Sequence, residues 1–169
     1  MARHILAVVV AIIALGSSSG AFAASANSAS TAGASIATVI APITLVHTAD
    51  ASINFGRFTV GSGGGKVSVS PASLGTTTGD VTFVPGSTVS ADQFSVTGEP
   101  GRSFGIGTPD GSITNGTKTI PFSTGAASLS GTINPTGGAT FSIGAILTLS
   151  GTEPTGTYSG SYTVTVGYQ

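Results

Sequence analysis

The sequence predicts an all-β protein, built as an antiparallel sandwich or barrel, and three observations support this prediction. Short runs along the chain alternate apolar with small polar residues, which is the period of a strand with one buried face. Turn-forming Gly, Pro, Asn and Asp residues separate these runs. After the first segment, no stretch has the apolar spacing of an amphipathic helix, so we expect short strands and no helices.

The expected strands follow one another from residue 36 onward. β-branched residues open the series, and Phe, Ile and Val recur in its later members. The expected strands are 36–40, 43–46, 53–55, 66–70, 81–84, 94–96, 104–106, 119–122, 141–143, 145–149 and 158–168. The turn signals between them are 63–65, 79–80, 85–86, 99–101, 109–111, 115–116 and 137–138. The recurring large apolar residues distinguish this region from a disordered chain rich in Gly, Ser and Thr.

The last run, residues 158–168, is the most informative. Its alternation places large side chains on one face and small polar residues on the other. The large side chains are Tyr158, Tyr162, Val164, Val166 and Tyr168. We expect this strand either to lie inside the sheet or to form an edge whose unpaired N–H and C=O groups invite another chain.

Composition argues against several classes of function. Only 7% of the 169 residues are charged, against about 25% in an ordinary soluble domain. Lys and Arg are too few to neutralise a run of phosphates, so we expect no nucleic-acid partner. Cysteine is absent, so no disulfide supports the fold. The expected surface of Ser, Thr, Gly and Asn is neutral and forms hydrogen bonds.

The first 23 residues have the features of a signal peptide. A basic start precedes an apolar stretch over residues 5–15, and small residues stand just before the expected cleavage site. That stretch is shorter than the roughly 20 residues of a membrane span, so we expect export without a transmembrane anchor. Residues 24–35 carry no apolar residue larger than Ala and predict a flexible N-terminal arm. Residues 36–169 are then expected to form one β-sandwich domain.

Two motif matches point to chemistry but lack its structural context. Residues 101–105 match the G-x-S-x-G pattern, which needs a helix after the Ser, whereas Gly107 and Pro109 follow here. Residues 61–66 resemble a phosphate-binding loop, but valines occupy its first Gly position and its Ser/Thr position. We interpret the first match as chance and the second as a hairpin or bulge loop.

Candidate catalytic and metal-binding residues are few. His47 is the only histidine after the first segment, and no Cys is present to share a zinc site with it, so we expect it to be structural or exposed. The acidic residues fall mostly in expected turns, without a close pair for glycosidase chemistry or a cluster for calcium. The sequence therefore predicts no enzyme, no catalytic residue, no cofactor and no metal.

Two stretches carry a family resemblance. Residues 37–45, Ala-Thr-Val-Ile-Ala-Pro-Ile-Thr-Leu, with Ile-Asn-Phe-Gly after them at 53–56, resemble the start of the proteobacterial "domain of unknown function 4402" family. Residues 156–168 resemble the end of the same family. Both features are also similar to spore-coat-U-type and other chaperone–usher pilins. Those pilins share an early strand ending in Asn-Phe-Gly and a C-terminal strand with a penultimate aromatic, here Tyr168.

The resemblance implies an immunoglobulin-like, pilin-like antiparallel β-sandwich that lacks one strand and receives it from another subunit. In such assembly a periplasmic chaperone first pairs with the C-terminal strand, and a neighbour's N-terminal arm replaces it at an outer-membrane usher. It thus implies a pilus or fimbria subunit at the cell surface, with a role in adhesion and with copies of itself or related subunits as partners. Residues 158–168 become the assembly strand, and Ile36, Thr38 and Ile40 the candidate donor segment.

A second class of protein remains open. A self-contained β-sandwich on the cell surface, which binds a partner without polymerising, has the same composition and the same alternating strands. An exposed aromatic platform would distinguish this second class. The chain has no Trp, and its three Tyr all fall in the last run, so few residues are present to form such a platform.

Overall fold

The computed structural model describes residues 30–169. The signal peptide expected over residues 1–23 and the first part of the expected arm, residues 24–29, lie outside the described residues. Every regular element of the described chain is a strand, which confirms the all-β prediction. Residues 30–169 contain no helix of the length and hydropathy needed to cross a membrane. The strands are β1 (Thr44–His47), β2 (Phe58–Val69), β3 (Gly75–Phe83), β4 (Asp92–Thr97), β5 (Ser103–Gly107), β6 (Gly111–Thr114), β7 (Thr119–Ala126), β8 (Ser130–Thr132), β9 (Gly138–Leu149), β10 (Ser159–Ser161) and β11 (Thr165–Tyr168).

The chain divides into two units between Ala37 and Thr38. Residues 30–37, the described part of the first unit, form no strand and are exposed. All strands belong to the second unit. The strand expected over residues 36–40 is therefore wrong. β-branched residues favour an extended backbone, but a strand also needs a hydrogen-bonding neighbour, and none pairs with this segment among the described residues.

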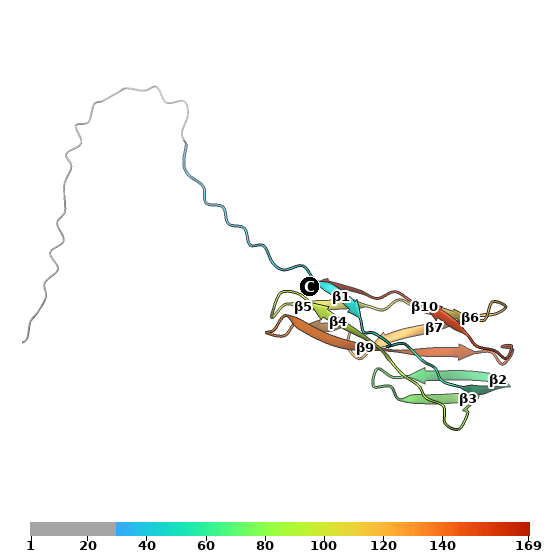
Figure 1. Ribbon diagram of the computed structural model, residues 1–169. Coiled ribbons are helices and arrows are strands. Elements are labelled where there is room, and N and C mark those ends of the chain that lie inside the picture. The colour runs from blue at the N-terminus through green and yellow to red at the C-terminus, as the bar shows by residue number, and fades with distance from the viewer. Residues whose placement is uncertain (1–29) are drawn as a thin grey trace, which may run out of the picture. The chain divides into compact units, whose positions relative to one another are not determined.

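Two curled antiparallel sheets make up the second unit (Figure 1). The larger sheet has the order β1-β4-β9-β7-β6-β10, and the β2–β3 hairpin joins it through β9. The smaller sheet has the order β11-β5-β8. β9 organises the larger sheet because it pairs with β4 along its first half and with β2 and β7 along its second. The sheet order thus begins at the first strand of the chain and ends in the C-terminal run.

Glycines shape the β2–β3 hairpin. The register slips between Val60 and Gly65, so the glycine-rich stretch is a bulge inside β2, which is one of the two expected alternatives, and the turn expected at 63–65 is wrong. Gly65 lies opposite Gly79, and both have a positive φ at which a Cβ would meet backbone atoms. The turn expected at 79–80 is wrong, because the positive φ of Gly79 is accommodated opposite the bulge and β3 continues through it.

Two apolar clusters fill the space between the strands. The first cluster is the larger and gathers around β2, β7 and β9. The second cluster gathers around β4 and β5 and is completed by partly buried side chains from β1 and from the C-terminal run. The buried members of the first cluster are Phe55, Val67, Val69, Val81, Ile120, Phe122, Ala145, Leu147 and Leu149. Those of the second cluster are Val96, Phe104, Ile106 and Ile133.

The C-terminal run is interrupted, whereas the sequence predicts one continuous strand. β10 pairs with β6 and β11 pairs with β5, and residues 162–164 between them belong to no strand. The partner strand changes at the same point: β5 ends at Gly107 and β6 begins at Gly111, so residues 162–164 lie opposite the loop between these two strands. The alternation of exposure nevertheless persists through the break.

Candidate functional site

The first and last strands of the fold lie next to each other without pairing. We call the space between β1 and β11 the seam. β1 pairs with β4 and β11 pairs with β5, and neither has a second partner among the described residues. Some Cα atoms of β1 and β11 nevertheless lie within 8 Å of each other. The C-terminus accordingly lies beside the start of β1 in Figure 1.

The register fixes which backbone groups face the seam. Thr48 N–H donates to Gln93 O, directly opposite, so every second residue of β1 bonds to β4. The N–H and C=O groups of Leu45 and His47 therefore point to the other side, toward the seam. Gln169 N–H donates to Ser103 O in the same way. By the same alternation, the backbone groups of Val166 and Tyr168 point toward the seam.

The side chains below the seam are only partly covered. Val164, Val166 and Tyr168 pack against the second cluster but remain partly exposed, while Thr163 and Thr165 face solvent. From β1, Leu45 packs on the same cluster and is also partly exposed. The sequence predicted this alternation of faces. The seam thus combines unpaired backbone groups with apolar side chains that still touch water.

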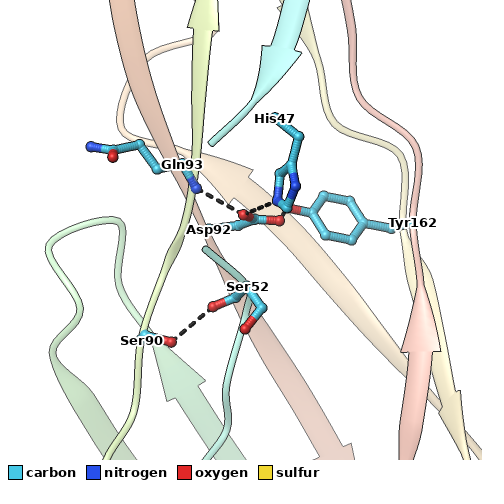
Figure 2. Close-up of polar contacts among 6 residues, drawn as sticks. All are labelled: His47, Ser52, Ser90, Asp92, Gln93 and Tyr162. Atoms are coloured by element: carbon cyan, nitrogen blue, oxygen red, sulfur yellow. Dashed lines mark hydrogen bonds and ion pairs between the residues drawn. The ribbon is translucent and has the colours of Figure 1, made fainter. Parts of the chain in front are cut away.

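A buried carboxylate lies at one end of the seam (Figure 2). Asp92, at the start of β4, is 5% exposed. His47 Nε2 lies 2.7 Å from Asp92 Oδ1, and the Gln93 N–H donates to the same oxygen over 2.8 Å. The Tyr162 hydroxyl donates to Asp92 Oδ2 over 2.7 Å. A carboxylate acceptor requires the proton of His47 to sit on Nε2. Three donors therefore satisfy a charge whose burial alone is costly.

Tyr162 carries this contact from the C-terminal segment. Its ring packs edge-to-face on Phe94, with centroids 6.5 Å apart, and on Phe122, with centroids 6.0 Å apart. Burial raises the pKa of the Tyr162 phenol well above its usual range, and the hydrogen bond to Asp92 and the charge of Asp92 raise it further. Burial and the contact with Asp92 therefore both favour the protonated phenol, which is the form that donates to Asp92.

A second tyrosine closes the other end of the seam. The Tyr168 hydroxyl donates to Ala41 O over 2.9 Å and accepts from the Glu99 N–H over 2.7 Å. The Ala41 N–H in turn donates to Glu99 Oε2 over 3.1 Å. A Cβ at Gly98 would overlap the Tyr168 hydroxyl, so this contact requires glycine there. The C-terminal strand is thus tied at both ends to the chain around β1.

His47 and Asp92 are two of the three residue types of a hydrolytic triad, but within residues 30–169 no hydroxyl is bonded to the second imidazole nitrogen of His47. In a hydrolytic triad, the Asp orients the His, and the second imidazole nitrogen of the His accepts a proton from the hydroxyl or thiol of the nucleophile. The nearby Ser90 hydroxyl instead donates to Ser52 O over 2.8 Å (Figure 2). Within residues 30–169, no three His, Asp or Glu side chains gather as metal ligands.

The residues predicted as donor segment and assembly strand do not all lie together. Val164, Val166 and Tyr168 pack on the second cluster below the seam, whereas Tyr158 and Tyr162 pack on the first cluster. The Tyr162 hydroxyl reaches Asp92 at one end of the seam, and the Tyr158 hydroxyl donates to Pro154 O. In the donor segment, Ile36 is 94% exposed and Thr38 is exposed, but Ile40 is partly buried. Their roles in assembly remain predictions.

Sequence reasoning missed Asp92. It assigned the acidic residues mostly to turns, and Asp92 lies in β4 on the buried face. The signal was present, because Asp92, Phe94 and Val96 are spaced by two and therefore share one face of a strand. His47, expected as structural or exposed, is half exposed and bonded to Asp92.

Fold and seam together define a class: all-β chains of curled antiparallel sheets whose first and last strands each keep an unpaired edge. Within that class the chain belongs to the family described as "Domain of unknown function (DUF4402)", whose model matches residues 43–168. The match begins just before β1 and ends on β11, so it includes both strands that flank the seam. No curated protein and no solved structure matches the chain. The family resemblance predicted from the sequence is thus confirmed, and the likeness to pilins remains a prediction.

Proposed function

We propose that this protein is an exported structural subunit of a pilus-like or fimbria-like appendage at the cell surface, assembled by strand exchange between copies, with a role in adhesion. The observation that carries the proposal is the seam, where the free edges of β1 and β11 lie side by side above an incompletely covered apolar cluster. An added strand satisfies such edges with main-chain hydrogen bonds and covers the apolar side chains below them. The added strand would complete an immunoglobulin-like sandwich.

The segment that precedes β1 suits the part of donor. Ile36, which shares a face of the extended donor segment with Thr38 and Ile40, is 94% exposed, which is unusual for a large apolar side chain. Among the described residues, no backbone–backbone hydrogen bond involves residues 36–41. This segment has β-branched residues that favour a strand, but no neighbouring strand pairs with it. The seam has two strand edges, but no strand lies between them. In the proposed assembly, the segment from one copy fills the seam of the next.

Export and partners are part of the same proposal. The signal-peptide pattern at residues 1–23 supports passage through the periplasm. A periplasmic chaperone that pairs first with the C-terminal strand would protect the seam until a second copy arrives, and an outer-membrane usher would bring the copies together. The free edges support this order of events because an uncovered edge is an aggregation hazard in transit.

Engineered cysteines test the exchange directly, because the native chain has none. Ala37→Cys in the donor segment and Thr165→Cys on β11 both place a thiol on the outward side of the proposed strand pair. Oxidation of the double variant should give a ladder of disulfide-linked oligomers on a non-reducing gel. The control combines Ala37→Cys with Thr76→Cys, since Thr76 is exposed on β3, away from the seam. Ladders of equal strength from both would refute strand exchange at the seam.

A further inference from the structure

Where β1 and β11 approach each other most closely, the seam is too narrow to accept a strand as it stands. Neighbouring strands lie about 4.8 Å apart, so two strands that flank a third are separated by about 9.6 Å. β1 and β11 have Cα atoms within 8 Å of each other. An incoming strand must therefore push the C-terminal segment away from β1, and whatever joins the two resists it.

The hydrogen bond from Tyr162 to Asp92 is one of these connections. Asp92 belongs to β4, the direct neighbour of β1, and also holds His47 of β1. Tyr162 belongs to the unpaired stretch between β10 and β11, where no ladder hydrogen bonds restrain the backbone. At this end of the seam, the side chain of Tyr162 rather than its backbone therefore ties the C-terminal segment to the strands around β1.

We propose that the Tyr162–Asp92 hydrogen bond is a latch that holds the empty seam closed, and that entry of a neighbour's strand breaks it. This inference rests on the proposed function, because it concerns the regulation of the same seam. Asp92 is a positioning residue in this scheme, since it acts through Tyr162 and does not itself contact the incoming strand.

The surroundings of Asp92 make the latch reversible. When the Tyr162 side chain moves away from Asp92, the carboxylate keeps two hydrogen-bond donors, His47 and the Gln93 N–H. Opening of the seam therefore does not leave a buried charge without donors. The imidazole of His47 has 50% of its side chain exposed, so water reaches this end of the seam and can replace the phenol on Asp92. Opening then costs one hydrogen bond to a charged group together with the ring contacts of Tyr162 with Phe94 and Phe122.

Removal of one hydroxyl tests the latch. Tyr162→Phe keeps the ring against Phe94 and Phe122 and deletes only the bond to Asp92. The probe is a fluorescent synthetic peptide of residues 30–41, added to the protein, with association followed by stopped-flow anisotropy. We expect the peptide to associate with Tyr162→Phe on the order of tenfold faster than with the native protein, the factor equivalent to about one hydrogen bond.

Tyr158→Phe is the matched control. Its hydroxyl donates to Pro154 O within the same loop, so its loss removes a hydrogen bond of the C-terminal run without touching the seam. We expect an unchanged association rate for this variant. A general loosening of the fold would accelerate association in both variants, and that result would overturn the latch.

The remaining outcomes separate the latch from the proposed function. Equal association rates for the native protein and Tyr162→Phe would overturn the latch and leave strand exchange standing. Slower association with Tyr162→Phe would also overturn it, because the phenol would then contribute to the bound state. Failure of the peptide to bind any of the three proteins would overturn the proposed function and this inference with it.

Discussion

The region around β9 and the seam have the same alternating sequence pattern, but they differ in the number of strands that flank each inward side chain. Leu147 of β9 lies between Val67 of β2 and Phe122 of β7, and it is fully buried. Val166 of β11 pairs with Ile106 of β5 on one side, faces the seam on the other, and remains partly exposed. Alternation determines which face a side chain takes in both regions. The number of neighbouring strands determines how far that side chain is covered.

The number of flanking strands distinguishes a region that can bind another strand from one that cannot. In the second half of β9, the inward side chains of Ile143, Ala145 and Leu147 have a paired strand on both flanks, so no further strand can be added there. At the seam, the inward side chains of β1 and β11 lack one flank, and the backbone groups that face this flank are those to which a strand can bond. An incomplete region of this kind is a surface to which another polypeptide can add.

The largest effect is expected in the complete region. Leu147→Ala leaves a cavity inside the first cluster and should lower the free energy of unfolding by about 2–5 kcal/mol. Ile146→Ala is the control, because Ile146 lies next to it on the opposite face of β9 and is 44% exposed. It should change the free energy by less than about 1 kcal/mol. Urea unfolding followed by circular dichroism measures both, and equal losses would contradict the assigned faces.

A smaller effect is expected at the seam. Val164→Asp places a carboxylate against the second cluster and should lower the free energy of unfolding by about 2 kcal/mol, through lost burial. Partial exposure of this position lets the carboxylate reach water and keeps the loss below that of a fully buried site. Thr163→Asp, on the solvent face, should stay within about 0.5 kcal/mol. Equal damage from the two would mean that the run is buried on both faces.

The hydrogen bonds of the Tyr168 hydroxyl at the far end of the seam depend on a glycine. Gly98→Ala adds a methyl group that overlaps the Tyr168 hydroxyl and crowds Ile133, and it should cost about 1–2 kcal/mol of stability. Gly125→Ala on β7 is the control, because a Cβ there meets no atom within 4 Å. Thermal unfolding should distinguish them, and a Gly98→Ala variant as stable as the Gly125→Ala variant would show that the Tyr168 contact does not constrain the fold.

The smallest effect concerns a loop outside both regions. Partial burial acts to raise the pKa of Glu153, but hydrogen bonds from the Ser150 hydroxyl and from the backbone of Ser150, Glu153 and Gly151 outweigh it and lower the pKa from 4.5 to about 2. A lowered pKa stabilises the fold above pH 4.5, and this contribution disappears as the pH falls through about 2. Glu153→Gln should therefore be less stable than the native protein at pH 6 and equally stable near pH 2. A stability difference that persists unchanged to pH 2 would rule out this role.

Particular residues show how far the sequence alone could lead. Alternation predicted the all-β class and the two faces of residues 158–168, because the side-chain period of a strand is a local property. Alternation could not predict that pairing breaks opposite the loop between β5 and β6, since the pairing of a strand depends on residues far away in the sequence. It also missed Asp92, because the contact to Tyr162 joins residues 70 positions apart. The C-terminal run was therefore predictable, and strands were also predicted at 43–46 and 94–96, where β1 and β4 lie, but the position of β1 beside the C-terminal run was not.

Residue-resolved hydrogen exchange in the presence of the arm peptide tests the central claim most directly. The amides of Leu45, His47, Val166 and Tyr168 point toward the seam and should exchange more slowly when the peptide of residues 30–41 is bound. The amides of Val46 and Gly167 already bond within the sheets and should change little. Protection of the four seam amides is the result that strand addition predicts. Protection along the free edge of β3 or β8 instead, or unchanged exchange at the seam with the peptide bound, would contradict it.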